Sequence, residues 1–241
     1  MIKTNSSKSG PLLWFIAIPE KLSGLQERAL SPGLGPEDTH PSRLPETLHP
    51  RIRAERLLGR YYLRQLLEET TGYLGSTWRI APDGDGKPQA THPQDRTAIH
   101  VNLSHTRGAL LCGLSDVSPL GVDLENIQRK VRFGKLQERC FTRAENGWIA
   151  EASNLEDGFF RAWTLKEAYL KATGLGIRIE LKDLEIVPSA SGPIGIAFRG
   201  KSQPDCSIGT RSHHHFRLSW CEVKSPDHER EALWEFKQFA K

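Results

Sequence analysis

The 241-residue sequence has few cysteines and no long hydrophobic run. Its four cysteines are widely spaced without a C-x-x-C pair, which argues against a zinc ribbon or a disulfide scaffold and favours a reducing, cytoplasmic compartment. The apolar run Leu12–Ile18 ends at Pro19 and is too short to span a bilayer. We therefore expect a cytoplasmic protein with no membrane-spanning segment, in which this run is a buried strand.

The sequence also lacks a strong excess of charge of either sign. Its 33 Lys and Arg residues against 29 Asp and Glu residues give a formal net charge of +4. This balance tolerates anionic partners but is too mild to indicate nucleic-acid binding. Hydrophobic residues at 37% and charged residues at 26% are typical of globular proteins, and the length allows one large domain or two modest ones.

The predicted elements fall into two series, each with a strand, a long helix and further strands. In the first half, a Pro-, Gly- and Ser-rich stretch precedes a helix over Ile52–Thr71, which Gly72 ends. In the second half, a helix that begins at the Thr142 capping box precedes a longer one over Asp157–Thr173. Further strands are predicted over Trp78–Ala81, Ile99–Leu103, Ala109–Leu114, Leu184–Val187, Ile194–Phe198 and Phe216–Val223, and a terminal helix over Glu229–Phe239. We predict an α+β fold of two similar α/β lobes, residues 1–118 and 119–241.

One short predicted strand, Gly121–Asn126, carries two acids in alternation with apolar residues. Because side chains alternate along a strand, Asp123 and Glu125 project from one face while Val122 and Leu124 project from the other. The two acids would be roughly 6–7 Å apart, close enough for one hard cation to engage both. For this strand taken alone, a solvated face of an antiparallel strand is the better interpretation.

The helix over Asp157–Thr173 presents two lines of side chains. An apolar line consists of Ala162, Leu165, Tyr169 and Ala172. A second line consists of Trp163, Glu167 and Lys171, spaced four residues apart and so stacked on one face. Glu167 and Lys171 are in the favourable order for an ordinary helical ion pair, which leaves Trp163 and Lys166 unexplained.

Two groups of basic residues are candidates for binding surfaces, although each is also typical of a solvated face. Arg53, Arg56, Arg60 and Arg64 form a stripe on the first helix, which suits a solvated face or an anion site equally well. Arg129, Lys130, Arg132, Lys135, Arg139 and Arg143 follow the acidic strand.

The segment G-V-D-L-E-N at 121–126, followed by F-F-R-A-W-T-L-K-E-A-Y-L-K-A-T-G-L-G-I at 159–177, resembles the 4′-phosphopantetheinyl transferase superfamily. The family pattern is roughly G-x-D followed by W-x-x-K-E-A-x-x-K, and this chain meets it without a departure. N-L-S-H at 102–105 and G-K-P at 86–88 match further family elements in order. The length is similar to that of the monomeric, two-lobed type that activates peptide synthetases, and the resemblance implies lobes related by a pseudo-twofold axis.

The resemblance implies an enzyme that takes coenzyme A as its donor. A serine hydroxyl of an apo acyl or peptidyl carrier protein attacks the pyrophosphate, which leaves the phosphopantetheine arm on the serine and releases adenosine 3′,5′-bisphosphate. Such a reaction depends on positioning and on charge neutralisation. The resemblance further implies that Asp123, Glu125 and Glu167 bind Mg²⁺. Glu167 is then also the base toward the serine, and Lys171 neutralises or protonates the departing phosphate.

In the first lobe, the resemblance assigns the coenzyme A phosphates to Lys87, Ser104 and His105, with Arg56 on the donor-binding helix; Lys171 would join them from the second lobe. Arg51 and Arg53 are candidates for the 3′-phosphate. The Pro-rich stretch before them departs from the arginine-rich segment of relatives. Glu145 matches a family position near the site, but its place in the capping box explains it without a catalytic role.

Carrier proteins are commonly acidic near the acceptor serine, so the basic run after the acidic strand is a candidate docking surface as well as a candidate solvated face. Two other functional hypotheses remain. One is a non-catalytic module that binds a nucleotide or nucleic acid through the Arg53–Arg64 helix; the other is a degenerate relative that binds coenzyme A without transfer. We expect a monomer that binds neither nucleic acid nor membrane.

Overall fold

The computed structural model describes residues 10–84, 86–130, 133–176, 179–187, 194–223 and 232–239. The chain divides into two compact units, which we call unit 1 (Met1–Asp116 with Leu233–Lys241) and unit 2 (Val117–Ala232). Among the helices in the described ranges, none has both the length and the apolar character that crossing a membrane requires.

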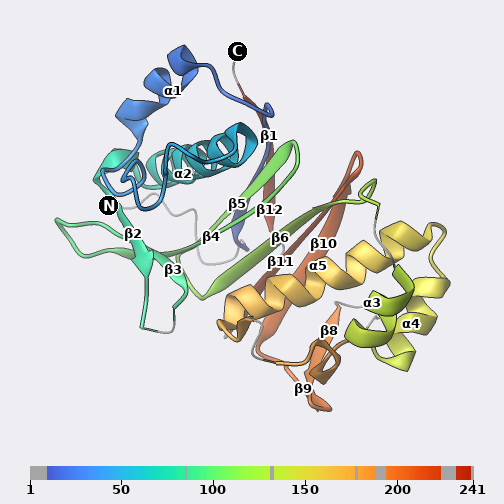
Figure 1. Cartoon of the computed structure of the whole chain (residues 1–241). Coiled ribbons are helices and arrows are strands. Elements are labelled where there is room, and N and C mark those ends of the chain that lie inside the picture. Colours follow the sequence, from blue (N-terminus) through green and yellow to red (C-terminus); the bar gives the residue numbers. More distant parts are fainter. Residues whose placement is uncertain are drawn as a thin grey trace. The chain divides into compact units, whose positions relative to one another are not determined.

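Unit 1 is a six-stranded sheet with one long helix on a face (Figure 1). The order across the sheet is β12 (Leu233–Gln238), β1 (Leu12–Ala17), β5 (Ala109–Ser115), β4 (Ala98–Thr106), β3 (Pro88–Thr91) and β2 (Arg79–Pro82). Neighbouring strands are antiparallel except β1 and β12, which are parallel. The helical segments are α1 (Gly24–Leu30), η1 (Ser31–Gly33), α2 (Pro50–Thr71) and η2 (Gly75–Thr77).

The long helix α2 ends at Thr71, as the sequence predicts, and begins at Pro50, two residues before the predicted start at Ile52. Pro50 occupies its first turn, where a missing N–H costs nothing, and the His49 side chain accepts a hydrogen bond from the Arg51 backbone N–H. At the other end Gly72 adopts φ 77°, a left-handed conformation that glycine takes without strain. The buried face carries leucines that join the core of the sheet: Leu57, Leu58, Leu63, Leu66 and Leu67.

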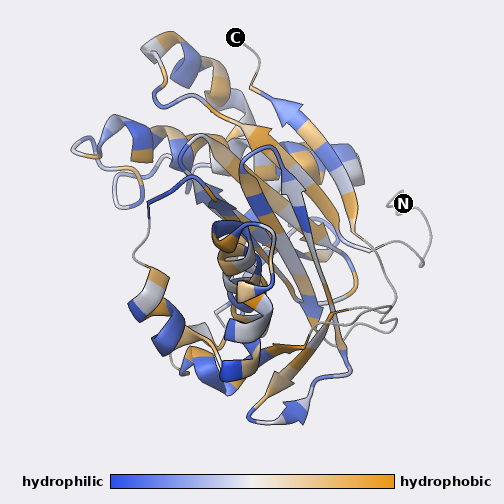
Figure 2. Cartoon of the chain, turned by 90° about the vertical axis from the view of Figure 1, so that its right-hand side faces the viewer, coloured by the Kyte–Doolittle hydropathy of each residue, from blue (hydrophilic) through white to orange (hydrophobic). Residues whose placement is uncertain are grey.

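Within its described residues, unit 2 contains two three-stranded sheets and three α-helices. The first sheet has the order β10 (Cys206–His213), β11 (Phe216–Val223) and β6 (Leu120–Asn126); the second has β7 (Leu184–Val187), β8 (Gly195–Phe198) and β9 (Lys201–Ser202). The helical segments are α3 (Phe133–Cys140), α4 (Arg143–Ala150), α5 (Leu155–Thr173) and η4 (Leu181–Asp183). Hydrophobic residues, orange in Figure 2, alternate with hydrophilic ones along the strands.

The helix α5 packs directly on β6 and β11, as Figure 1 shows. Asn154 caps its first turn by accepting a hydrogen bond from the Asp157 backbone N–H, and Gly174 ends it with φ 73°. The close contact depends on Gly121. A Cβ atom at this position would lie 2.0 Å from the Ala168 carbonyl oxygen and 2.4 Å from the Ala172 nitrogen.

The structure corrects the prediction for the C-terminus. Within the described part of Glu229–Phe239, the chain forms strand β12 rather than a helix, and it belongs to unit 1 rather than to the second lobe. The reason is tertiary, because β12 pairs with β1 along its whole length, from Leu12 opposite Leu233 to Ala17 opposite Gln238. Strand formation here depends on an available sheet edge more than on local propensity.

Two further differences concern strands. Strand β4 continues to Thr106, so Ser104 and His105 lie within a strand and not in the turn that the sequence suggested. Strand β10 was not predicted, because its exposed half is polar and contains Gly209. Its pairing with β11 along eight residues supplies the stability that its sequence lacks.

Replacing Gly121 with alanine should destabilise unit 2 by at least about 3 kcal/mol, because the added methyl meets helix backbone that cannot rotate away. Urea denaturation followed by circular dichroism measures the change. Gly147→Ala is the matched control: its added Cβ has open space within α4, so we expect a gain of about 0.5–1 kcal/mol. Equal stability of Gly121→Ala and wild type would contradict the described packing of α5 on β6.

Candidate active site

The acids of β6 lie on the face of the strand that α5 covers. Gly121 faces the helix backbone, and residues two and four positions further along share its face, so Asp123 and Glu125 face α5 as well. Asp123 is 6% exposed, whereas Glu125 is half-buried. Val122 and Leu124 project from the opposite face and are buried. The alternation along the strand therefore has the orientation that the sequence predicts.

A lysine from α5 reaches across to this strand. The Lys171 Nζ atom lies 2.8 Å from Asp123 Oδ1 and donates a second hydrogen bond, of 3.0 Å, to the Val122 carbonyl oxygen. The spacing of Glu167 and Lys171 suggested a helical ion pair, but the partner that the structure gives Lys171 is a carboxylate on another element. The ammonium group thus joins helix to strand at the site.

Burial and like charge act on the remaining two carboxylates. Burial raises the pKa of Glu125 to about 7, with a smaller contribution from the charge of Asp123 and opposition from Arg129. Burial also raises the pKa of Glu167, again with help from Asp123 and against Lys171. Each carboxylate therefore carries an electrostatic penalty that a nearby cation would relieve.

The donor set fits a hard cation, although the described residues do not form a complete metal cage. Within the described ranges, no group of three or more His, Cys, Asp or Glu side chains is placed to hold a metal ion. Mg²⁺ does not need such a cage, because it usually takes one or two carboxylates and completes its shell with water and substrate phosphate. Carboxylate oxygens on one face of β6 and on α5, with raised pKa values, match that requirement.

Lys166, the other lysine of the motif, is buried and structural. Its side chain is 1% exposed, and Nζ donates to Glu145 Oε2 at 2.7 Å and to the carbonyl oxygens of Cys140 and Leu181 at 2.8 and 2.9 Å. Burial lowers the pKa of Lys166, and the Glu145 carboxylate opposes that shift. This explains Lys166, which the helical pattern alone did not.

Glu145 has the capping role that the sequence predicts and a second role besides. Its Oε2 atom accepts the Thr142 backbone N–H at 2.8 Å, which completes the capping box of α4. Its Oε1 atom accepts the Ile186 backbone N–H at 2.8 Å. One carboxylate therefore ties α4, α5 and β7 together.

Sequence reasoning missed the polar residues that β11 contributes. Register places Ser219 opposite Asp123 and Arg217 opposite Glu125, so both face α5. Ser219 exchanges a 2.7 Å hydrogen bond with Thr164, and Arg217 forms an ion pair with Asp157, its Nε lying 3.1 Å from Oδ1. Only the strand register reveals these residues, because they lie far from the motifs in sequence.

In unit 1, two of the residues assigned to coenzyme A lie at the end of β4. Ser104 is buried, and His105, whose side chain is 51% exposed, places Nδ1 3.4 Å from Glu55 Oε2. Glu55 is buried on α2 and also receives a 2.8 Å hydrogen bond from Arg51. His105 is therefore exposed on one side and held on the other by a carboxylate.

Lys87 lies in the turn before β3. Gln89 pairs with His100, and continuing this antiparallel register places Lys87 level with Asn102, two residues from Ser104. Its backbone N–H donates to Asp83 Oδ1 at 2.9 Å. Lys87 therefore lies next to the start of β3, the strand that pairs with β4, whereas Ser104 and His105 lie within β4 itself.

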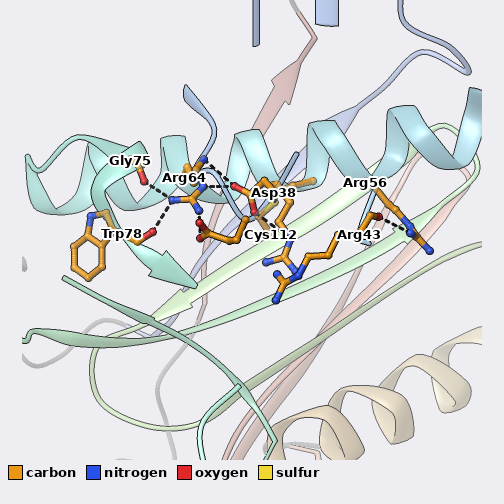
Figure 3. Close-up of polar contacts among 11 residues, drawn as sticks. Asp38, Arg43, Arg56, Arg64, Gly75, Trp78 and Cys112 are labelled. Atoms are coloured by element: carbon orange, nitrogen blue, oxygen red, sulfur yellow. Dashed lines mark hydrogen bonds and ion pairs between the residues drawn. The ribbon is translucent and has the colours of Figure 1, made fainter. Parts of the chain in front are cut away.

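The basic stripe of α2 divides into residues with different surroundings. Arg64 is fully buried and donates to Asp38 at 2.5 Å and to the Gly75 and Trp78 carbonyl oxygens at 2.8 and 2.7 Å (Figure 3). Arg53 is held by Glu27. A buried Arg64 cannot contact a nucleic acid, which counts against a binding module that uses the whole stripe.

Arg56 remains on the outside of unit 1. Its Nη1 atom donates a 2.7 Å hydrogen bond to the Arg43 carbonyl oxygen, as Figure 3 shows. This contact links α2 to the Pro-rich stretch, and it leaves the rest of the guanidinium available to a ligand.

Comparison with known proteins identifies the class of this chain. Residues 119–221 match the family model described as the 4′-phosphopantetheinyl transferase superfamily. The 4′-phosphopantetheinyl transferase HetI of Nostoc sp. is 31% identical over 186 residues, which cover 75% of each chain. The 4′-phosphopantetheinyl transferase gsp of Aneurinibacillus migulanus is 27% identical over 171 residues, which cover 70% of this chain and 68% of that one. The chain belongs to the 4′-phosphopantetheinyl transferase superfamily.

Solved structures show a partial similarity. A holo-(acyl-carrier-protein) synthase from Bacillus anthracis str. Ames, crystallised in complex with CoA (3′,5′-ADP), superposes with a TM-score of 0.40 and 19% identity. The superposition covers 45% of this chain and 97% of that one.

Removing the buried ammonium of Lys166 should cost about 3–5 kcal/mol of stability, because Glu145 is left as an unpaired charge in the core. We expect urea denaturation of Lys166→Ala to show a free energy of unfolding lower by that amount. The uncharged pair Lys166→Met/Glu145→Gln should lose less free energy of unfolding, since glutamine keeps the capping box. The control is Arg199→Ala, whose exposed pair with Asp183 should be worth less than about 1 kcal/mol. A double variant less stable than Lys166→Ala would contradict this account.

Proposed function

We propose that this 4′-phosphopantetheinyl transferase moves the phosphopantetheine arm of coenzyme A to a serine hydroxyl of an apo carrier protein, acyl or peptidyl, and releases adenosine 3′,5′-bisphosphate. The family membership supports the reaction. The observation that supports its placement in unit 2 is the Lys171–Asp123 ion pair beside two carboxylates of raised pKa. The Lys171 ammonium of α5 there meets carboxylates on the face of β6 that the helix covers.

We propose that Asp123, Glu125 and Glu167 hold a Mg²⁺ ion together with the donor's phosphate oxygens. Bound there, the ion would neutralise charge on the pyrophosphate. The three carboxylates outnumber the neighbouring cations Lys171 and Arg129, so the face keeps negative charge that a cation bound together with the donor's phosphates would offset. Asp123 is the most firmly placed of the three, since it is buried and held by Lys171.

Glu167 is suited to take the proton of the attacking serine. A base works best when its pKa approaches the working pH, and burial moves the pKa of Glu167 upward. Lys171, one helical turn further, keeps its ammonium at Asp123 and would present positive charge to the departing phosphate. Lys166, by contrast, uses its ammonium group in buried structural contacts, and we assign it no role in the transfer reaction.

We propose that Lys87, Ser104, His105 and Arg56 bind phosphates of coenzyme A, and that Lys171 also acts as a phosphate-binding residue. Ser104 and His105 are consecutive residues near the end of β4, and Lys87 lies in the turn before the neighbouring strand β3. Glu55 Oε2 lies 3.4 Å from His105 Nδ1 and can orient the imidazole, whose other side is exposed to a ligand.

The carrier protein should meet the basic residues that follow β6. Of these, Arg129 and Lys130 line a hollow of about 680 Å³ together with Ile127, Gln128, Phe133, Asn154 and Glu156. Lys135 and Arg139 lie on α3, whose side chains there are exposed or half-buried. Acidic carriers would be attracted by this surface. We further propose that the enzyme acts as a monomer in the cytoplasm, in keeping with its four free thiols.

Changing Glu167 or Asp123 tests these roles. Glu167→Gln and Asp123→Asn should each lower kcat at least about 100-fold while the protein stays folded, because a base or a metal ligand is lost. Intact-mass spectrometry of an apo carrier protein with coenzyme A and Mg²⁺ measures the gain of the phosphopantetheine arm. Glu69→Gln, at an exposed position of unit 1, should keep wild-type activity. Wild-type turnover in folded Glu167→Gln would remove Glu167 from the mechanism.

Reversing charge on α3 tests the docking surface. Lys135→Glu/Arg139→Glu should raise KM for an acidic carrier about 10-fold and leave KM for coenzyme A unchanged, because only the carrier meets α3. Steady-state kinetics with each substrate varied in turn separates the effects. Lys201→Glu, an exposed change on β9, serves as the control for net charge. A KM for the carrier that stays at the wild-type value would show that the basic run is merely solvated.

A further inference from the structure

Two cysteines that are far apart in sequence become neighbours in the first sheet of unit 2. Cys206 pairs in register with Val223, and Ile208 pairs with Cys221, so the two cysteines lie diagonally across β10 and β11 on one face. Both belong to the core cluster that α5 covers, together with Leu165 and Tyr169. The hairpin turn at His214 brings them together.

The two thiols contact each other and differ in their exposure. A hydrogen bond joins them, and it lowers the pKa of the Cys206 thiol, since Cys221 can donate its S–H to a thiolate at Cys206. Burial raises the pKa of Cys221, whose side chain is 0% exposed, whereas Cys206 is only half-buried. Cys206 is therefore the more exposed of the two thiols, and Cys221 lies diagonally across from it on the same face of the sheet.

We propose that Cys206 and Cys221 form an oxidisable dithiol in which Cys206 reacts first and Cys221 resolves. The Cys206 thiolate attacks a small disulfide such as oxidised glutathione, forms a mixed disulfide and expels one glutathione thiolate. The Cys221 sulfur then attacks Cys206 Sγ and expels the second glutathione, which leaves with the proton of Cys221. The protein loses two hydrogens, and one glutathione disulfide becomes two glutathione thiols.

The position of the pair in the sheet favours a reversible bond. Diagonal neighbours have Cα atoms roughly 7–8 Å apart, slightly beyond the usual span of a disulfide of about 4.4–6.8 Å. Strand β10 is an edge strand and can move toward β11, but closing the bond pulls the ladder from its relaxed geometry. Such a disulfide is more easily reduced than a relaxed structural one.

The pair also lies beneath the motif helix. Burial raises the pKa of Tyr169 to about 12, and the charges of Cys206 and Cys221 add to the shift, which places the phenol beside both thiols. Tyr169 lies between Glu167 and Lys171 on α5. The other two cysteines, Cys112 in the core of unit 1 and Cys140 at the end of α3, lie outside this cluster.

Mass spectrometry of the full chain under native conditions tests the proposal. Incubated with oxidised glutathione, the wild-type protein should lose two hydrogens, and non-reducing peptide mapping should join Cys206 to Cys221; dithiothreitol should restore the original mass. Cys221→Ala should stop at a mixed disulfide on Cys206. Cys206→Ser should react at least about 10-fold more slowly, and Cys112→Ser should behave as wild type.

Three results would overturn the proposal: a native protein that forms no disulfide, a mapped bond between any other pair, or a Cys206→Ser protein that reacts as fast as wild type. The first two need no variant, so they hold even if a substitution at the buried Cys221 fails to fold. The outcome is independent of the proposed transfer activity, which is measured in a separate assay.

Discussion

The ion pair between Lys171 and Asp123 is the interaction on which the site depends. It holds α5 to β6 at the point where the strand's acids turn toward the helix. This ion pair can form because Gly121, two residues before Asp123 on the same face of β6, lets the helix backbone approach the strand. Burial of Glu125 and Glu167 raises their pKa values, and the nearby charge of Asp123 adds to both shifts. The close packing of α5 on β6 therefore also shapes the electrostatics of the site.

The two lysines of the motif show how burial decides a residue's role. Lys166 and Lys171 lie five positions apart on one helix, yet Lys166 is 1% exposed and Lys171 is 31% exposed. The first is surrounded by Glu145 and carbonyl oxygens and stabilises the fold, whereas the second is partly exposed beside Asp123. The motif thus combines one buried structural lysine with one whose role toward phosphate stays a prediction.

Features that depend on local sequence are predictable from local patterns. Period-two alternation predicts that Asp123 and Glu125 share a face, and the leucine spacing together with Gly72 predicts α2. Strand β12 and the polar half of β10 were missed because partner strands stabilise them. The Arg217–Asp157 pair and the Cys206–Cys221 contact escaped for the same reason, since only strand register brings them together. The roles of Asp123, Glu167 and the β4 residues toward ligands stay predictions.

The carboxylates around Lys171 should hold a divalent cation once the donor's phosphates are present. Electron paramagnetic resonance of Mn²⁺, titrated into the protein with and without coenzyme A, measures this directly. We expect one tightly bound Mn²⁺ per chain only when coenzyme A is present. The affinity for Mn²⁺ should fall at least about 10-fold in Asp123→Asn. Equal Mn²⁺ binding by wild type and by Asp123→Asn/Glu167→Gln would contradict it.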